Sequence, residues 1–326
     1  MRSTRSMIKA WIGFALLAAA IDTTSAQTDS LQYPNQTVRI VVPVSPGSIA
    51  DGFARMIAEK LAGMWKQQVI VENRPGLAGT TSVAKSPPDG YTLFLNSNGH
   101  TIAGAINKNL QFDPVKDFAG ITLIASVPLV MIVPPASLAK TVKDFVALAK
   151  ERPGQLNVAN AGVSTTSFLS AEIFKQIAGI NVVHVPYRGA PEAVTAVVRG
   201  DAHLYFAPIP SAQELEAASK VVVLAVNSAA RVPQMPDVPT IAEAGLADFK
   251  YESWFGMLAP AGTPRPILQK VSRDIAAVLG VADVRDRMHK QGALPVTGTP
   301  EQFDAIIRND TERNAKVLRD AGISAK

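Results

Sequence analysis

Strand and helix signals alternate along this chain, and the alternation limits the folds that it can adopt. VRIVVPV, at 38–44, has the apolar, β-branched composition of a buried strand. Phe53, Ile57 and Leu61 then recur at every fourth position, which is the spacing of one helix face. Further runs of both kinds follow along the chain. Because alternating strands and helices form helix-covered sheets, we predict an α/β protein with mostly parallel sheets.

The length of 326 residues favours two domains, and the pattern suggests where they divide. ITLIASVPLVMIVPP, at 121–135, is strand-like but contains Pro128, so we interpret it as a crossing between two domains. A strand, a small polar turn and a helix then follow again from residue 155, and KVVVLAVNS, at 220–228, is interpreted as the return crossing. From Pro264 onward the pattern is mainly helical. The predicted division is a first lobe at 27–125, a second lobe at 126–228, and a return to the first lobe at 229–326.

The N-terminus has the three-part pattern of a secretory signal peptide. Three basic residues precede an apolar run at 11–21, which is too short to span a bilayer, and small residues follow up to Ala26. We therefore expect residues 1–26 to be removed and the rest to be exported to the periplasm. The alternative is a membrane anchor that is never cleaved.

Composition excludes several classes of site. The chain has no cysteine, so disulfides, zinc–thiolate sites and a lipid-modified cysteine are excluded. The net charge of +5 is scattered, without the Lys/Arg run that is typical of nucleic-acid binding. The four histidines show no metal-ligand spacing, and no G-x-S-x-G motif occurs. We predict no catalytic residue, no metal site and no cofactor.

Two glycine turns lie between a strand and a helix. PGSIAD, at 46–51, lacks the Gly-Lys-Ser/Thr of a P-loop, and no G-x-G-x-x-G is present, so a nucleotide is not indicated. The free N–H groups of a helix N-terminus nevertheless favour an anion, with Ser48 as N-cap and Asp51 closing a capping-box-like pair. NAGVSTTS, at 160–167, is a second such junction. The alternative is that both are only turns, but two junctions in two lobes favour an organic anion held between them.

Three other residues have side chains of the kinds that bind anions, and the sequence gives each a different expected setting. His100, which follows a strand in LNSNGHT, is expected to face a cleft, whereas His184 is expected to be a core histidine. Arg188 follows a strand end, where it would give a carboxylate a bidentate contact or else form an interdomain salt bridge.

Six motifs in order resemble a known family over Tyr33–Ile323: YPNQTVRIVVPVSPGSIAD, VIVENRPGLAGT, SPPDGYTLFLNSNG, FDPVKDFAGIT, VVHVPYRGAPEAV and MPDVPTIAEAGL. They are similar to the Bug-type periplasmic solute receptors of tripartite tricarboxylate transporters. The resemblance implies two α/β lobes around a cleft, like a Venus flytrap, with mixed sheets flanked by helices. It also implies a small carboxylate ligand, held by the loop after the first strand and by a loop of the second lobe. Those loops match 44–51 and 160–167.

The chain departs from the family pattern at two places. Val44 and Ser48 replace a phenylalanine and a glycine in the first loop, and Ala207, Pro208 and Ile209 stand where an Asp-Asn pair is common. Losing that acid weakens the case for an amino-acid ligand, whose ammonium group needs a carboxylate partner. The predicted ligand-binding residues are Ser45, Pro46, Gly47, Ser48, Asp51, Asn98, His100, Gly162, Ser164, Thr165, Thr166, Arg188 and Pro208.

The function expected from these observations is that of an extracytoplasmic receptor. It would bind a di- or tricarboxylate, aliphatic or aromatic with a preference for aliphatic, and deliver it as a monomer to membrane transporter subunits. Two alternatives stay open: a sensory receptor that reports ligand occupancy to a signalling partner, and a periplasmic enzyme on the same fold.

Overall fold

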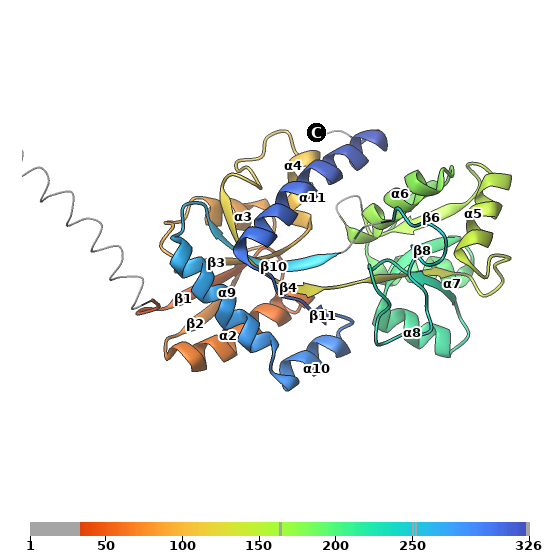
Figure 1. Ribbon diagram of the computed structural model, residues 1–326. Helices are drawn as coiled ribbons and strands as arrows, with labels where there is room; N and C mark the ends of the chain where they lie inside the picture. The colour runs from red at the N-terminus through yellow and green to blue at the C-terminus, as the bar shows by residue number, and fades with distance from the viewer. Residues whose placement is uncertain (1–32, 163–164, 250, 252, 324–326) are drawn as a thin grey trace, which may run out of the picture.

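The computed structural model describes residues 33–162, 165–249, 251 and 253–323, and they form two lobes side by side (Figure 1). Each lobe has a sheet flanked by helices, with parallel and antiparallel strands in both. The predicted two-lobed α/β architecture with mixed sheets is therefore confirmed. The expectation of mostly parallel sheets is wrong, because antiparallel strand pairs outnumber the parallel ones among the described residues. The predicted signal peptide, at 1–26, lies outside the described residues. Among those described, no helix is long and apolar enough to cross a membrane.

The sheet of the first lobe has six strands in the order β11-β4-β10-β3-β1-β2. β1 is parallel to β2 and β3, whereas β10 runs antiparallel between β3 and β4. The strands are β1 (Val38–Val42), β2 (Val69–Asn73), β3 (Thr92–Ser97), β4 (Phe118–Ser126), β10 (Trp254–Pro260) and β11 (Leu294–Pro295). A central strand of this sheet thus comes from late in the sequence.

The sheet of the second lobe has five strands in the order β7-β6-β8-β5-β9. β6 is parallel to β7 and β8, and β5 is antiparallel to β8 and β9. The strands are β5 (Leu129–Val133), β6 (Asn157–Asn160), β7 (Val183–Pro186), β8 (Leu204–Pro208) and β9 (Val222–Val226). All five come from one continuous part of the chain.

The chain passes between the sheets twice. β4 ends at Ser126 and β5 begins at Leu129, so the segment interpreted as one interrupted strand is two strands of different sheets, separated at Pro128. The return lies between β9 and β10. The lobe limits predicted at residues 125 and 228 stay a prediction.

Helices lie on both faces of each sheet (Figure 1). In the first lobe they are α2 (Ile49–Trp65), α3 (Leu77–Ala84), α4 (Gly99–Ile106), α9 (Arg265–Leu279), α10 (Ala282–Lys290) and α11 (Pro300–Asp320). In the second lobe they are α5 (Val142–Glu151), α6 (Thr166–Ala178), α7 (Ala190–Arg199) and α8 (Ile209–Ala217). Two of their ends follow from local caps: Thr141 and Asp144 form a capping box at the start of α5, and Gly179 ends α6 in a left-handed conformation.

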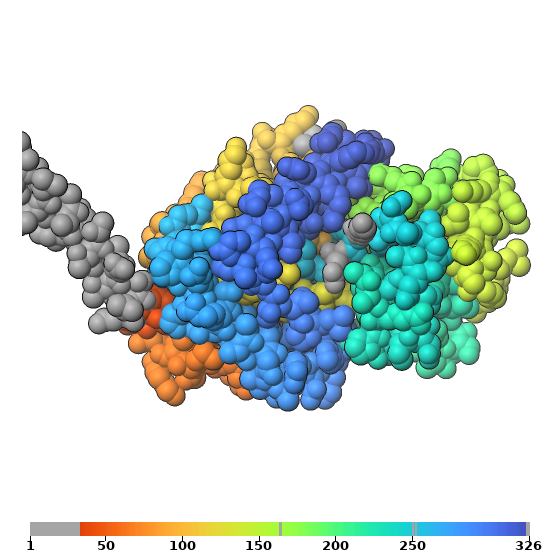
Figure 2. Space-filling model, viewed as in Figure 1, coloured from red at the N-terminus to blue at the C-terminus, as the bar shows by residue number. Residues whose placement is uncertain are grey.

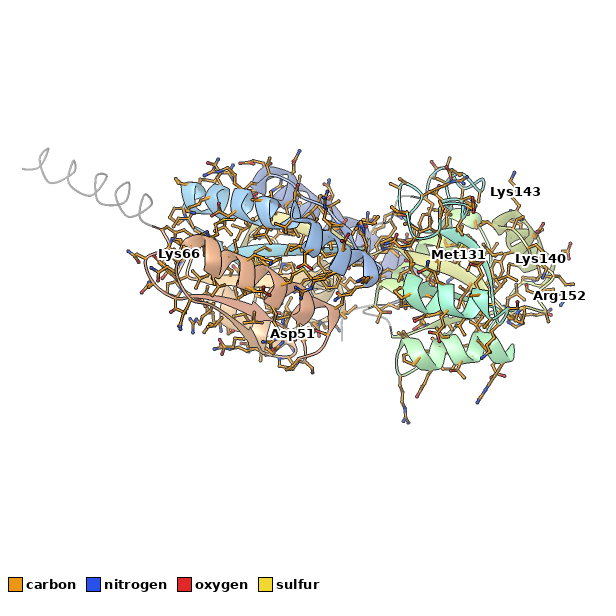
Figure 3. The ribbon with its side chains drawn as sticks, turned by 90° about the horizontal axis from the view of Figure 1, so that it is seen from below. Asp51, Lys66, Met131, Lys140, Lys143 and Arg152 are labelled. Atoms are coloured by element: carbon orange, nitrogen blue, oxygen red, sulfur yellow. The ribbon has the colours of Figure 1, made fainter. Side chains whose placement is uncertain are left out.

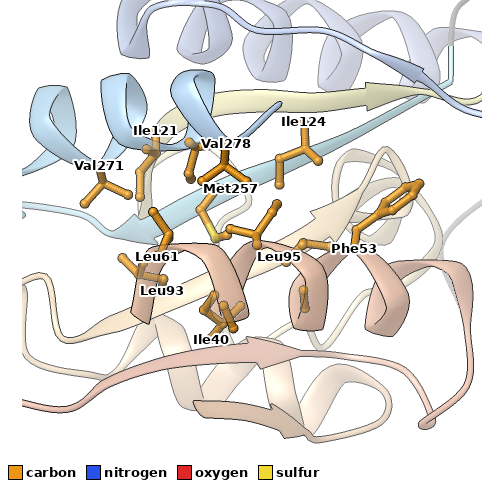
Figure 4. Packing of buried hydrophobic residues seen from close by; sticks show 14 of the residues in the cluster. Ile40, Phe53, Leu61, Leu93, Leu95, Ile121, Ile124, Met257, Val271 and Val278 are labelled. Atoms are coloured by element: carbon orange, nitrogen blue, oxygen red, sulfur yellow. The ribbon is translucent and has the colours of Figure 1, made fainter. Parts of the chain in front are cut away.

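The core of the first lobe follows from strand alternation. Ile40 of β1 packs with Leu61 of α2 and Val271 of α9 on one face of the sheet (Figure 4). Its neighbour Val41 points to the other face, where it joins the cluster that contains Phe303 of α11. Both faces are therefore buried, and the strand ends are left as the accessible edge of the sheet.

Helix α11 packs against both lobes. Near its start, Phe303 and Ile307 belong to the core of the first lobe. Near its end, Val317 and Leu318 are buried in the apolar cluster of the second lobe. The C-terminal helix therefore contributes to the cores of both lobes.

Candidate functional site

Four helices begin directly where parallel strands end. In the first lobe, α2 follows β1 and α4 follows β3; in the second, α6 follows β6 and α8 follows β8. Ligands of open α/β sheets bind at this edge, where backbone N–H groups of the first helical turn lack partners. Figure 3 shows Asp51, in the first turn of α2, at the end of the helix nearer the second lobe, and Lys66 at the far end.

The first loop, which contains Ser45, Pro46 and Gly47, is exposed and folds around the carboxylate of Asp51. Gly47 has a φ of +82° and donates its N–H to Asp51 Oδ2 at 2.9 Å. Ser48 is the N-cap of α2, as predicted, and its hydroxyl accepts from the Asp51 N–H at 3.3 Å. The carboxylate reaches Gly47 instead of the N-cap residue, so the predicted capping-box-like pair is only half formed.

Asp51 is buried, and its carboxylate has two further partners, Arg55 and Asn73. Its carboxylate forms an ion pair with Arg55 at 3.0 Å and accepts from Asn73 Nδ2 at 3.0 Å. Burial raises the pKa of Asp51, but the hydrogen bonds from Arg55, Gly47 and Asn73 outweigh it and lower that pKa below the usual value. Asp51 is therefore a buried, ionised carboxylate whose hydrogen bonds hold the loop in its conformation. Only the spacing of Asp51 and Arg55, one helical turn apart, was a signal for this in the sequence.

The second loop has a similar construction. Gly162 has a φ of +116° and donates its N–H to Asn160 Oδ1 at 3.0 Å. Thr165 is the N-cap of α6, where its hydroxyl donates to the Gly162 carbonyl at 2.6 Å. Thr166 follows as the first residue of the helix. The predicted residue Ser164 lies outside the described residues.

The donors left for a ligand are not those of the two glycines. Both glycine N–H groups are occupied by side-chain acceptors within their own loops. By contrast, the N–H groups of Ile49 and Ala50 in α2, and of Thr166 in α6, form no hydrogen bond to any residue that the structure describes. A helix N-terminus also carries partial positive charge, so each loop can stabilise an anion.

Two bridges between the lobes bring these helix starts together. Asn98, the buried N-cap of α4, donates from Nδ2 to the Tyr251 hydroxyl at 2.5 Å and accepts from the Thr166 hydroxyl at 3.5 Å. This joins the starts of α4 and α6.

The second bridge joins the starts of α2 and α8. A β-carbon built on Gly52 of α2 would lie 3.7 Å from Nε2 of Gln291, and one built on Gly292 would lie 2.8 Å from Cδ of Pro210 in α8. Gln291 and Gly292 are therefore in contact with both lobes. The two bridges thus pair the start of α4 with that of α6, and the start of α2 with that of α8, across the lobes.

Two further predicted residues, Arg188 and Pro208, lie at strand ends of the second lobe. Arg188 is exposed, and the N–H of the preceding Tyr187 donates to the Asn160 carbonyl at 2.8 Å, which places it beside the second loop. No hydrogen bond or ion pair of its guanidinium is found within the described part of the chain. Pro208 ends β8 and precedes α8, and it is partly exposed.

The expectation that His100 faces a cleft is wrong. The His100 side chain is buried, stacked on Phe112 and in edge contact with Phe118, and Nε2 lies 2.8 Å from the Pro114 carbonyl. Burial lowers the pKa of His100 to about 4, so the ring is neutral near pH 7. The strand end carried polar residues, but the helix that begins there turns His100 toward the aromatic core.

The described residues contain no group of three or more His, Cys, Asp or Glu side chains that would hold a metal ion. His184 lies 2.9 Å from Glu172 on the neighbouring helix, in the partly buried setting of a structural histidine. The site as described offers backbone donors, hydroxyls and one arginine, which is the chemistry of anion binding.

A family model described as "Tripartite tricarboxylate transporter family receptor" matches residues 53–323. The chain belongs to this receptor family. Protein BugT of Bordetella pertussis is 30% identical over 331 residues, covering 100% of both chains, which supports the Bug-type resemblance.

Two solved structures of similar proteins carry organic acids in their descriptions. The first is Rpa4515 of R. palustris with adipate, at a TM-score of 0.74 and 32% identity, covering 90% of this chain and 100% of that one. The second is MatC of Rhodopseudomonas palustris with bound malate, at a TM-score of 0.70 and 31% identity, covering 88% and 100%. This receptor thus resembles binding proteins whose solved ligands are dicarboxylates.

Proposed function

We propose that this receptor binds a small organic dicarboxylate between its lobes, in the periplasm, and delivers it to the membrane subunits of a tripartite tricarboxylate transporter. The observation that carries the proposal is the pair of helix starts, α2 and α6, whose first N–H groups form no hydrogen bond to a described residue. One carboxylate accepts from these donors. The protein works as a binder and not as an enzyme.

Arg188 supplies the second recognition point in this proposal. It adjoins the second loop and its guanidinium has a planar pair of donors that matches a carboxylate. A ligand with two carboxylates would satisfy both the helix starts and the arginine, whereas a monocarboxylate would satisfy only one. The adipate and malate of the similar structures are dicarboxylates, which supports this ligand class.

A thermal-shift screen followed by calorimetry tests the proposal. Aliphatic dicarboxylates such as adipate and malate should stabilise the protein and bind with micromolar or tighter affinity, and an aromatic dicarboxylate such as phthalate should bind more weakly. A neutral sugar should not bind. Binding of the sugar without binding of any acid would contradict the proposal.

Measuring the intact mass of the purified protein tests separately whether it is exported and cleaved. Protein recovered from the periplasm should begin near Gln27. Retention of Met1 together with recovery in the membrane fraction would contradict this part of the proposal.

A further inference from the structure

A cavity of about 410 Å³ lies where the chain passes between the two sheets, on the side of α11 (Figure 2). Ser126 at the end of β4, Tyr251 and Trp254 on the return passage, and Asp310 of α11 all line it. None of the predicted ligand-binding residues that the structure describes belongs to its lining. The cavity therefore shares no lining residue with the candidate carboxylate site, although its Tyr251 hydroxyl contacts Asn98 of that site.

The cavity is large enough for a small organic molecule. An apolar cavity of roughly 150 Å³ holds benzene, so this one has room for a ring with substituents. Its walls are mainly apolar and include Leu123 of β4, Ile306 of α11, and the rings of Phe249 and Trp254. Such walls favour an apolar body.

The charged groups in the lining already neutralise one another. Asp310 forms an ion pair with Arg313 at 2.7 Å and accepts from Trp254 Nε1 at 2.7 Å, and Arg313 also lies over the Tyr251 ring at 5.1 Å from its centre. Burial raises the pKa of Asp310 despite these two partners. A further charge of either sign would lose its hydration without gaining an opposite charge, so the lining disfavours an ionised ligand.

One polar group in the wall lacks a partner. Ser126 is 2% exposed, and its hydroxyl has no hydrogen-bond partner among the described residues. Buried hydroxyls are normally hydrogen-bonded, so this one points to a missing acceptor or donor in the cavity. Ser228, beside Ala229 of the lining, is also buried, but its hydroxyl donates to the Ala230 carbonyl at 2.6 Å, so of the two serines only Ser126 lacks a partner among the described residues.

We propose that this cavity, beside the two passages between the lobes, binds a small uncharged molecule with an apolar ring and one hydroxyl group. The ring packs between β4 and α11, and the hydroxyl forms a hydrogen bond with Ser126. This second site adjoins the carboxylate site at Tyr251 but has its own lining residues and takes a ligand of different charge.

Calorimetry with benzyl alcohol, in the absence of any carboxylate, tests the proposal. Benzyl alcohol should bind with one molecule per chain, and toluene, which lacks the hydroxyl, should bind roughly three- to tenfold more weakly. Benzylammonium, the charged analogue, should not bind measurably. Ser126→Ala should remove the preference for benzyl alcohol over toluene, whereas the matched control Ser228→Ala should retain it.

A second test of the proposal fills the cavity with a larger side chain. Ile306→Trp should weaken benzyl alcohol binding at least tenfold, with circular dichroism checking that the variant folds. If it does not fold, Val296→Phe fills the same cavity from another wall. No binding by the wild-type protein, or unchanged affinity in a folded filled variant, would overturn the proposal. Because no carboxylate is used, the outcome is independent of the proposed receptor function.

Discussion

Gly47 and Gly162 are required for their backbone conformation and not because a larger side chain would clash with a neighbour. A β-carbon on either would meet no atom within 4 Å, but both have φ values in the left-handed region that other residues rarely adopt. A substitution would therefore change the turn, and with it the direction of the N–H groups that follow. The prediction for either loop is a loss of ligand binding that exceeds the loss of stability.

We expect Gly47→Val and Gly162→Val each to abolish ligand-induced stabilisation while circular dichroism stays native-like. Losing two charge-assisted hydrogen bonds costs roughly 3–6 kcal/mol, a hundredfold or more in affinity. Backbone strain should also lower the melting temperature, so a control with the same strain is needed. Gly179→Val provides it, because Gly179 has a φ of +59° and open space at the other end of α6. Equal affinity losses in Gly162→Val and Gly179→Val would show that the loop is only a turn.

The environment of Glu172 predicts that the stability of the protein depends on pH. Its carboxylate is buried beside His184 at 2.9 Å and Lys175 at 3.1 Å. Burial raises its pKa, but hydrogen bonds from His184, Gln176 and Lys175 lower it to about 2. Because the folded-state pKa lies below that of the unfolded chain, near 4.5, the stabilisation is complete above pH 4.5 and is lost as the pH falls toward 2.

Glu172→Gln should therefore lower the free energy of unfolding at pH 7 by on the order of 3 kcal/mol, and the difference from wild type should shrink as the pH approaches 2. Urea unfolding at pH 7, 4 and 2.5 measures this. Glu216→Gln, at an exposed position in α8, is the control. A difference for Glu172→Gln that does not vary with pH would contradict the assignment.

At the scale of elements, α11 is fixed to the sheet by close contact with β10. A β-carbon on Gly256 would lie 2.1 Å from Cζ of Phe303, so the ring of α11 rests directly on this strand. Gly256→Ala should therefore destabilise the protein by about 1–3 kcal/mol in urea unfolding. Gly63→Ala, within α2 and without a neighbour in 4 Å, should instead stabilise it by about 0.5–1 kcal/mol. Equal effects would show that α11 does not pack on β10 in this way.

The same elements show how far the sequence predicted the fold. The strand-to-helix junctions after β1 and β6 and the N-cap at Ser48 are local features, so composition and spacing revealed them. β10 was not predicted, because WFGMLAP is short and becomes a strand by pairing with β3 and β4, which lie far back in the sequence. Likewise, no local pattern indicates that Asp51 would bond Gly47, or that α4 would turn His100 inward.

At the scale of the molecule, the Tyr251 hydroxyl links the lobes through Asn98. Tyr251→Phe would leave the buried Asn98 amide without this partner, at a cost of about 1–3 kcal/mol, and should weaken the contact between α4 and α6. We expect a larger radius of gyration by small-angle X-ray scattering and lower stability in urea. Tyr187→Phe, a partly buried tyrosine for which no hydroxyl contact is found among the described residues, should change neither. An unchanged radius in Tyr251→Phe would contradict the role of this bridge.

The position of β10 between β3 and β4 has a consequence for the order in which the protein is completed during synthesis. The five strands of the second sheet all emerge by residue 226, so that sheet can close while the rest of the chain is still being made. The first sheet has a gap beside β3 until residues 254–260 arrive, although β1 to β4 are made first. The lobe that starts earliest is thus finished last, and its open strand edges stay exposed longest to aggregation and to proteases.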